Sequence, residues 1–291
     1  MDTLVKAMTK NGAIRIMVIN STQTVQEVAF RHKTLPTASA ALGRTLSATA
    51  LLGAQLKGKG ESVTVQINGK GPLGTILCEA NTKGELRGFV SNPDVLLINE
   101  VTHKLDVGAA VGKDGTLRVI RNTHMKADFT GTVELQTGEI GDDFAYYFTV
   151  SEQTPSAVSL GVLVGKDNEI LASGGLLIQL LPSSSETDLL IAEDVVRHLR
   201  PISEMIHDGM TPDEIALALF DEVEIMGVST IQFKCSCSKE RLKDALSTID
   251  SDEIDLMIKE DKGAEITCHF CNTSYHFSDE ELTHIHRENH E

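Results

Sequence analysis

Four of the five cysteines form two close pairs near the end of the chain, and this spacing constrains the fold more than any other feature. One residue separates Cys235 from Cys237, two separate Cys268 from Cys271, and thirty residues lie between the pairs. Each pair can present two thiolates from one turn of the chain, and a folded insertion can bring the pairs together, as in tetrahedral zinc sites with four sulfur ligands. The spacing predicts that these four residues bind one zinc ion per chain.

Zinc bound by four sulfur atoms has no open position for water or substrate, so the pattern argues against a hydrolytic metal centre. The N-terminus, Met1 to Lys6, has no basic segment followed by an unbroken apolar stretch, and no window approaches the roughly 18 uncharged apolar residues that span a bilayer. We therefore expect a soluble, cytoplasmic chain. Stable disulfides are rare in that compartment, which favours metal binding over permanent disulfide bonds.

Acidic residues are concentrated in the last third of the chain. The formal net charge is −16, yet residues 1–183 hold 17 acidic and 17 basic side chains, whereas residues 184–291 hold 25 acidic and 9 basic ones. Nucleic-acid binding depends on Lys and Arg side chains that neutralise phosphates, and basic amphipathic helices bind membrane surfaces. The charge distribution therefore predicts no nucleic-acid partner and no membrane partner. It is typical of a solvated acidic surface.

Residues 1–183 show the patterns of a domain that mixes strands and helices. Asn11-Gly12 between apolar runs predicts a hairpin, and alternating apolar residues predict further strands, for example at 63–67. Small residues on nearly all sides of the segment after Pro36 predict a helix that is buried on most faces. Hairpin strands with interspersed helices indicate an N-terminal α+β core domain with a mixed sheet, not a doubly wound parallel sheet.

Residues 184–229 are predicted to form a short, acidic helical linker without strands. Thr211-Pro212-Asp213-Glu214 is typical of a helix N-terminus, because Thr and Glu three residues apart can cap each other's backbone N–H groups. Residues 230–291 contain both cysteine pairs and are predicted to form a small C-terminal zinc-binding domain. The expected architecture is thus an α+β core, a helical linker and a Cys₄ module.

The residues alone leave two interpretations of the zinc module open. Zinc can simply hold together a module of about 60 residues that would otherwise be marginally stable. Alternatively, the same dependence can serve as a switch. Structural zinc contributes on the order of 10–16 kcal/mol to a small module, more than the roughly 5–15 kcal/mol of net stability of a whole domain. An oxidant that converted the thiolates into disulfides would release the ion and unfold the module.

The chain resembles a known family in its cysteine pattern and along nearly its whole length. Five further segments agree with the family's signatures: Thr37–Leu46, Gly69–Gly74, Gly138–Asp143, Ser151–Ala157 and Gly174–Pro182. Together with the Cys-x-Cys and Cys-x-x-Cys motifs near the end of a chain of this length, they resemble the redox-regulated chaperones called heat-shock protein 33, or the 33-kDa chaperonin.

The resemblance implies an ATP-independent holdase chaperone that is not an enzyme. In its reduced, zinc-bound form such a chaperone is inactive. By analogy with the family, oxidation pairs Cys235 with Cys237 and Cys268 with Cys271, releases the zinc ion and destabilises the adjoining linker. The active form is a homodimer that binds unfolded or partly unfolded client proteins and prevents their aggregation during oxidative and heat stress.

Two alternative functions are ranked below the chaperone. A thiol–disulfide oxidoreductase would place its Cys-x-x-Cys motif at a helix N-terminus, which lowers the thiol pKa, but Asn272 to Phe277 are typical of a turn and a strand. A zinc-ribbon nucleic-acid-binding protein would need basic and stacking aromatic residues around the metal, and this end of the chain is acidic.

Other candidate functional residues have simpler structural interpretations. Gly69–Gly74 lacks the Gly-Lys-Ser/Thr ending of a phosphate-binding loop and is predicted to be a turn. Asp142-Asp143 is predicted to cap a helix, and Cys78 is predicted to be an unreactive core thiol because it lies in an apolar strand. The sequence contains no nucleophile-elbow motif, so no catalytic residue is predicted. His269 and His276 are expected at the surface or beside the metal ligands.

A client-binding surface must be covered at rest, since a permanent apolar patch would promote aggregation. Apolar residues of the linker are candidates to cover such a surface on the N-terminal sheet or to contribute to it. They are Ile202, Met205, Ile206, Met210, Ile215, Leu219 and Phe220. The alternative, that they only form the linker's own small core, remains open at this point.

Overall fold

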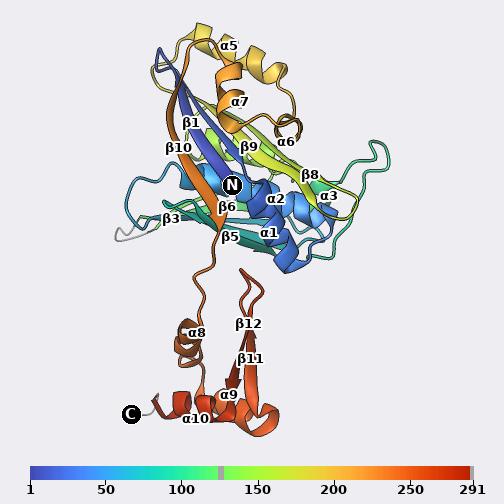
Figure 1. Cartoon of the computed structure of the whole chain (residues 1–291), viewed down its shortest axis with the longest axis vertical. Coiled ribbons are helices and arrows are strands. Elements are labelled where there is room, and N and C mark those ends of the chain that lie inside the picture. The colour runs from blue at the N-terminus through green and yellow to red at the C-terminus, as the bar shows by residue number, and fades with distance from the viewer. Residues whose placement is uncertain (124–127, 289–291) are drawn as a thin grey trace. The chain divides into compact units, whose positions relative to one another are not determined.

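The protein is described by a computed structural model that covers residues 1–123 and 128–288 (Figure 1). The chain divides into two compact units, Met1–Lys234 and Cys235–Glu291, and each is described here by itself. Among the described residues, no helix has both the length and the apolar character needed to cross a bilayer.

Ten strands of the first unit form one sheet made of two halves. The first half has five antiparallel strands in the order β8, β9, β2, β1 and β10. Their bounds are Ser156–Val164 (β8), Ile170–Leu180 (β9), Ile14–Asn20 (β2), Asp2–Thr9 (β1) and Val223–Phe233 (β10). The predicted hairpin at Asn11-Gly12 is confirmed as the connection between β1 and β2.

The second half has the strand order β5, β4, β3, β6 and β7. Their bounds are Glu85–Val90 (β5), Thr75–Asn81 (β4), Ser62–Asn68 (β3), Thr116–Asn122 (β6) and Phe129–Glu134 (β7). The two halves meet where the end of β10 pairs in parallel with β5, through Gln232 and Phe233. Gly69–Gly74 is a turn between β3 and β4, as predicted.

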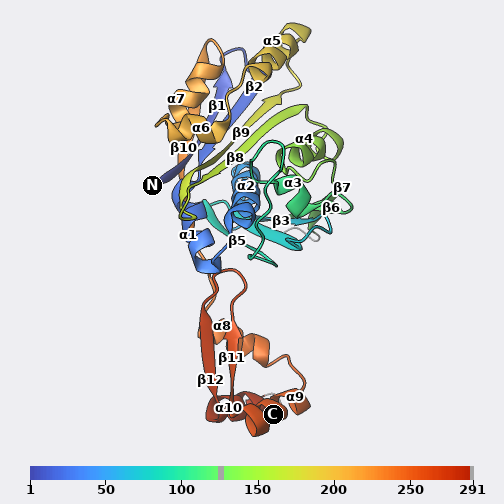
Figure 2. The same cartoon turned by 90° about the vertical axis from the view of Figure 1, so that its right-hand side faces the viewer.

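The helix predicted after Pro36 is confirmed as α2 (Pro36–Gly53), and nearly all of its side chains are buried. It lies between the two halves of the sheet, contacting β3, β4 and β5 on one side and β2, β8 and β9 on the other (Figure 2). Small residues permit this close approach: a Cβ atom on Gly43 would lie 2.7 Å from Val25 and one on Gly53 would lie 2.8 Å from Ala80. The helix is therefore the centre of the main apolar core.

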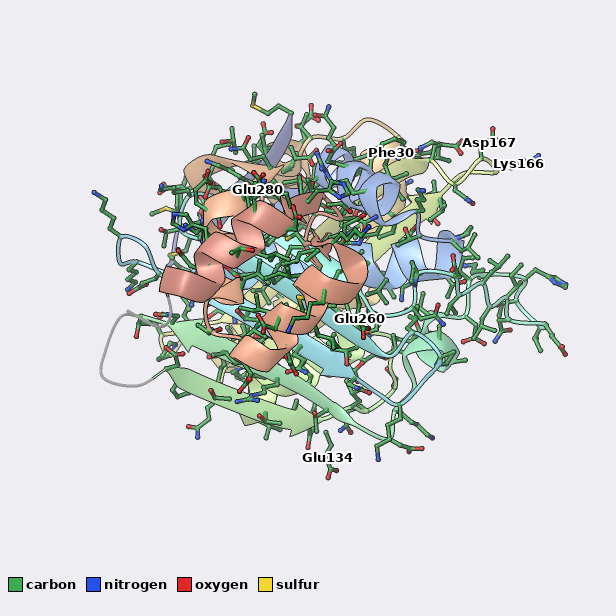
Figure 3. The ribbon with its side chains drawn as sticks, turned by 90° about the horizontal axis from the view of Figure 1, so that it is seen from below. Phe30, Glu134, Lys166, Asp167, Glu260 and Glu280 are labelled. Atoms are coloured by element: carbon green, nitrogen blue, oxygen red, sulfur yellow. The ribbon has the colours of Figure 1, made fainter. Side chains whose placement is uncertain are left out.

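Three short helices complete the covering of the sheets: α1 (Thr22–His32), α3 (Val107–Val111) and α4 (Gly141–Val150). The prediction that Asp142-Asp143 caps a helix is confirmed for α4. Buried Asp143 accepts hydrogen bonds from the backbone N–H groups of Gln136, at 2.7 Å, and Ile140, at 3.0 Å. Phe30 of α1 is 74% exposed, and Figure 3 labels it together with Lys166 and Asp167 of the turn between β8 and β9.

The linker helices are α5 (Glu186–Arg197), α6 (Ile202–His207) and α7 (Pro212–Leu219). The predicted capping box of α7 is confirmed, since the Glu214 carboxylate accepts from both the backbone N–H and the hydroxyl of Thr211, at 2.9 Å each. These helices lie on the face of β1, β2 and β9 that is opposite α2 (Figure 2). The sheet therefore has apolar layers on both faces.

Strand β10 corrects the predicted end of the linker. Residues 184–229 were expected to contain no strand, but β10 begins at Val223 and pairs with β1 until Ile231, opposite Asp2. It therefore runs across the boundary expected between residues 229 and 230. The alternating, β-branched residues of Val223–Phe233 favour a strand, and the open edges of β1 and β5 provide its partners.

The second unit is small and has little apolar core. Its elements are α8 (Lys239–Leu246), α9 (Ser251–Leu256), a π-helical turn (Met257–Asp261), β11 (Gly263–Thr267), β12 (Ser274–Ser278) and α10 (Asp279–Glu288). Strands β11 and β12 form an antiparallel hairpin. Among its described side chains, the buried apolar cluster consists of Leu246, Ile254, Phe277, Leu282 and Ile285. Five such residues provide little hydrophobic stabilisation for a folded unit.

Candidate metal centre

Two loops place the four predicted ligands. The first connects the end of β10 to α8 and contains Cys235 and Cys237, followed by Ser238, whose hydroxyl caps α8 by accepting from the Arg241 N–H at 3.3 Å. The Arg241 guanidinium returns to the same loop and donates to the carbonyl of Ser236 at 2.9 Å. The start of α8 thus holds the first pair of thiols in a fixed turn.

The second loop is the tight turn between β11 and β12, and it contains Cys268 and Cys271. Its backbone is closed by two hydrogen bonds, from the Cys268 N–H to the Thr273 carbonyl at 3.0 Å and from the Asn272 N–H to the Cys268 carbonyl at 2.8 Å. Asn272 has a φ of 55°, in the left-handed region that Asn tolerates better than most residues. The hairpin therefore orients both sulfur atoms to the same side.

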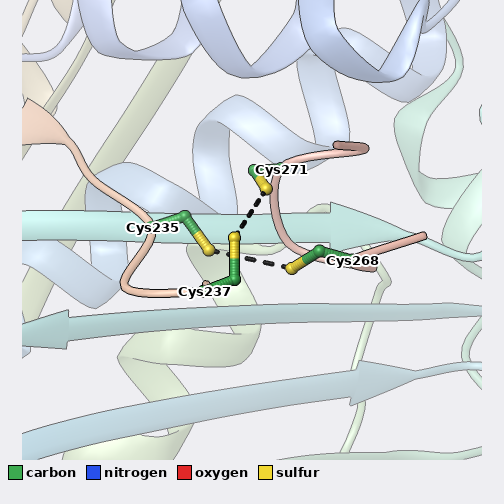
Figure 4. Close-up of side chains that lie close together, drawn as sticks. All are labelled: Cys235, Cys237, Cys268 and Cys271. Carbon is green, nitrogen blue, oxygen red and sulfur yellow. Dashed lines mark hydrogen bonds between the residues drawn. The ribbon is translucent and has the colours of Figure 1, made fainter. Parts of the chain in front are cut away.

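The structure brings all four predicted sulfur atoms together (Figure 4). All lie within 4.8 Å of one another, with Cys235 Sγ 3.8 Å from Cys268 Sγ and Cys237 Sγ 3.3 Å from Cys271 Sγ. Four sulfurs at the usual zinc distance of about 2.3 Å would be separated by about 3.8 Å in a tetrahedron. The spacing and the soft, all-thiolate donor set fit a zinc ion.

All five cysteines of the chain are free thiols in this structure. The short sulfur contacts join a thiol of one pair to a thiol of the other, whereas the disulfides implied by the family resemblance lie within each pair. Cys78 is fully buried in the main core, and burial raises its pKa far above the usual range of a thiol. This confirms the predicted core location of Cys78.

Burial is the main influence on the acidity of the clustered thiols in the absence of a cation. It raises the pKa of Cys235, Cys237 and Cys268. For Cys271, burial acts in the same direction, but hydrogen bonds from Thr273 and Cys237 outweigh it and lower the pKa to about 7. A divalent cation would favour the deprotonated form of all four, so the cluster is organised for metal binding.

Tyr275 and Thr273 are site residues that the sequence interpretation missed. The Tyr275 hydroxyl lies 3.2 Å from Cys237 Sγ, and the Thr273 hydroxyl lies 3.3 Å from Cys271 Sγ. The hydrogen bond to Cys237 raises the Tyr275 pKa to about 12, so this hydroxyl keeps its proton. A signal was present in the sequence: Thr273 and Tyr275 alternate where β12 begins, and alternate residues of a strand share one side.

The two candidate histidines do not belong to the thiol cluster among the described residues. Both are exposed, and His276 lies on β12 with its Nδ1 3.5 Å from the Glu265 carboxylate. The segment after Cys271 leads into strand β12, as predicted. It is not a helix N-terminus, so the geometry that activates a Cys-x-x-Cys oxidoreductase is not present at this turn.

Comparison with known protein families gives a match over nearly the whole chain. A sequence model of the family described as "Hsp33 protein" matches residues 2–278. The chain belongs to the heat-shock protein 33 family. The resemblance found in the sequence is thus confirmed. The chaperone role of the family is supported by the same match.

Relatives named 33 kDa chaperonin cover nearly the whole chain. The protein of Bacillus licheniformis is 47% identical over 97% of this chain and 98% of its own length, and that of Enterococcus faecalis is 45% identical over 97% and 95%. The solved structure of the Thermotoga maritima 33 kDa chaperonin, a heat shock protein 33 homolog, superposes with a TM-score of 0.90 at 33% identity, covering 98% of both chains. These findings confirm the predicted α+β fold.

Proposed function

We propose that the chain is a redox-regulated, ATP-independent holdase that is inactive while Cys235, Cys237, Cys268 and Cys271 hold one zinc ion. The observation that carries the proposal is the cluster of four thiols within 4.8 Å in a unit with five buried apolar side chains among those described. Because little else stabilises this unit, loss of the ion would unfold it. The chemistry at the four sulfurs then controls the fold of everything after Lys234.

Oxidation would form two disulfides, which we propose to be Cys235–Cys237 and Cys268–Cys271. Each disulfide removes two electrons from two thiolates, and one peroxide accepts them and leaves as two waters after taking up two protons. Two peroxides therefore convert all four ligands and leave the zinc ion without donors. Peptide mapping under non-reducing conditions tests the pairing, and Cys235–Cys268 and Cys237–Cys271 are the cross-pairs that would contradict it.

The linker helices cover an apolar surface that could bind client proteins once the helices loosen. Ile202 and Ile206 of α6 and Ile215 of α7 are buried in one apolar cluster that also contains Ile16 and Val18 of β2. We propose that loosening of α5–α7 after zinc release uncovers this apolar surface for unfolded proteins. The surrounding acidic side chains would keep the loosened segment soluble.

We further propose that the active form is a cytoplasmic homodimer and that its role is to bind clients, not to catalyse a reaction. Named chaperonin relatives support a chaperone role. Sedimentation of reduced and peroxide-treated protein tests the oligomeric state, with a shift from monomer to dimer expected on oxidation.

Light scattering of a thermally aggregating client tests the proposed function. The zinc-loaded, reduced protein should leave aggregation unchanged, and the peroxide-treated protein should suppress it at near-stoichiometric amounts without ATP. Insulin reduction, measured in parallel, checks for oxidoreductase activity. Equal suppression by the reduced and oxidised proteins would contradict redox control, and turnover of insulin would favour the oxidoreductase.

A further inference from the structure

The four sulfur atoms accept different kinds of hydrogen bond. Cys235 Sγ accepts from the backbone N–H of Cys237, and Cys268 Sγ accepts from the backbone N–H groups of Phe270 and Cys271. These donors belong to the turns themselves. They remain in place whatever side chains surround the site.

Side-chain hydroxyls contribute at the other two sulfurs. Cys271 Sγ lies 3.3 Å from the Thr273 hydroxyl and also accepts from the Thr273 backbone N–H. The Cys237 Sγ lies 3.2 Å from the Tyr275 hydroxyl. This hydroxyl is held at the Cys237 sulfur by a residue of β12, 38 positions away in the chain.

The packing of Tyr275 fixes this hydroxyl at the site. Tyr275 pairs with Ile266 across the β11–β12 hairpin and packs against the small cluster that contains Phe277 and Leu282. The phenol oxygen also lies 3.4 Å from the Cys237 carbonyl, a second acceptor on the same residue. The ring is thereby anchored in the core of the unit while its hydroxyl contacts the first cysteine pair.

A hydrogen bond to a thiolate lowers its nucleophilicity because the donor withdraws the electron density that attacks an oxidant. When Cys237 is oxidised, its sulfur would attack one peroxide oxygen, an S–O bond would form, and the O–O bond would break. The released hydroxide takes a proton to become water. The Cys235 thiolate then attacks the oxidised sulfur, forms the S–S bond and expels hydroxide, which is also protonated.

We infer that the Tyr275 hydroxyl is a positioning group that restrains the oxidation of Cys237 and so sets the oxidant threshold of the switch. The inference rests on the proposed redox function and adds a residue that governs its rate. Without the hydroxyl, the Cys237 sulfur would lose its contact with a side-chain donor. It would then become a more reactive member of the cluster.

The test compares the zinc-loaded, full-length chain with its Tyr275→Phe variant, which keeps the ring. We expect zinc release by limiting peroxide, followed with a colorimetric chelator, to accelerate by about three- to tenfold, the factor expected from the loss of one hydrogen bond of ordinary strength. Release driven by excess chelator without oxidant should stay unchanged. Alkylation of Cys237, mapped by mass spectrometry, should become faster by a similar factor.

Two further variants serve as controls. Thr273→Val should accelerate oxidation less, since Cys271 keeps its backbone donor, and Tyr146→Phe removes the hydroxyl of an exposed tyrosine on α4 and should change nothing. If Tyr275→Phe accelerated peroxide-driven and chelator-driven zinc release equally, Tyr275 would only stabilise the fold, and the inference would be overturned. Unchanged alkylation of Cys237 in this variant would also overturn it. If peroxide released no zinc from the unmodified chain, the proposed redox function would be contradicted. The alkylation rates of Cys237 would still decide the role of Tyr275.

Discussion

Burial distinguishes the fifth thiol from the other four. Cys78 lies in β4 inside the main core, where a Cβ atom on neighbouring Gly88 would lie 2.7 Å from its sulfur. Cys235, Cys237 and Cys268 are only half-buried. An oxidant therefore has access to the cluster and not to Cys78, because the reactive form of a thiol is the solvated or metal-bound thiolate.

We expect Cys78→Ser to leave zinc content and redox switching unchanged. The Thr49 side chain already interacts with this position and can accept a hydrogen bond from serine, so the cost should be about 1–2 kcal/mol of unfolding free energy. Metal analysis and client light scattering before and after peroxide check the first expectation, and denaturant unfolding checks the second. Loss of switching in this variant would show that the fifth thiol takes part.

The double substitution Cys268→Ser and Cys271→Ser should abolish stoichiometric zinc binding. Two remaining thiolates cannot complete a tetrahedral site, and without the ion the five-residue core of this unit is too small to keep it folded. Metal analysis of the purified protein gives the answer. One zinc per chain in the double variant would disprove the ligand assignment.

The ligands could be predicted from sequence because Cys-x-Cys and Cys-x-x-Cys pairs specify chemistry by spacing alone. Tyr275 could not be identified as readily, because its contact with Cys237 depends on how the hairpin faces the α8 loop. Asp143 lies between these two cases. Its capping role could be predicted from its place at a helix start, but its hydrogen bonds to the preceding loop could be found only from the structure.

At the scale of elements, the three linker helices are attached to the sheet unequally. Helix α5 exposes Leu190, at 60%, and Ile191, at 47%, while Ala192 is its buried residue. Helices α6 and α7 bury Ile202 and Ile215 completely. The attachment of the linker therefore depends on α6 and α7 more than on α5.

The variant Ile215→Ala should loosen the linker, because removing a buried side chain of this size costs about 2–5 kcal/mol. Hydrogen exchange of the reduced, zinc-loaded chain should show faster exchange in α6 and α7. Under the proposed function, holdase activity should also appear without oxidant. Leu217→Ala on the same helix is the matched control, since Leu217 is 48% exposed and its loss should cost less than about 0.5 kcal/mol. Equal effects of the two variants would contradict the role of the buried face.

Strand β10 shows why the boundaries of elements could not be predicted from the sequence. Its acidic start and Gly227 are typical of a connection, yet β1 and β5 both present edges that β10 completes. Its β-branched residues favour a strand, so the local pattern is mixed, and pairing with distant strands decides the outcome. For the same reason, a truncation after residue 183 would remove a strand from the sheet, so single substitutions in α6 and α7 test the linker more cleanly.

At the scale of the whole chain, stability is distributed unevenly. The main core surrounds α2 with residues from both halves of the sheet, whereas the unit after Lys234 has a small apolar cluster and the thiol site. Oxidation should therefore unfold Cys235–Glu291, loosen α5–α7 and leave the sheet protected. Hydrogen exchange before and after peroxide treatment measures this, and uniform changes along the chain, or none in α5–α7, would contradict the expectation.

The central claim is that the state of the four thiols controls client binding. Zinc release and suppression of client aggregation, measured in one sample as peroxide is added stepwise, test it most directly. Both should rise together, reach completion at about two peroxides per chain, and reverse when reductant and zinc are restored. Full suppression by protein that still holds its zinc, or complete zinc loss without any suppression, would contradict it.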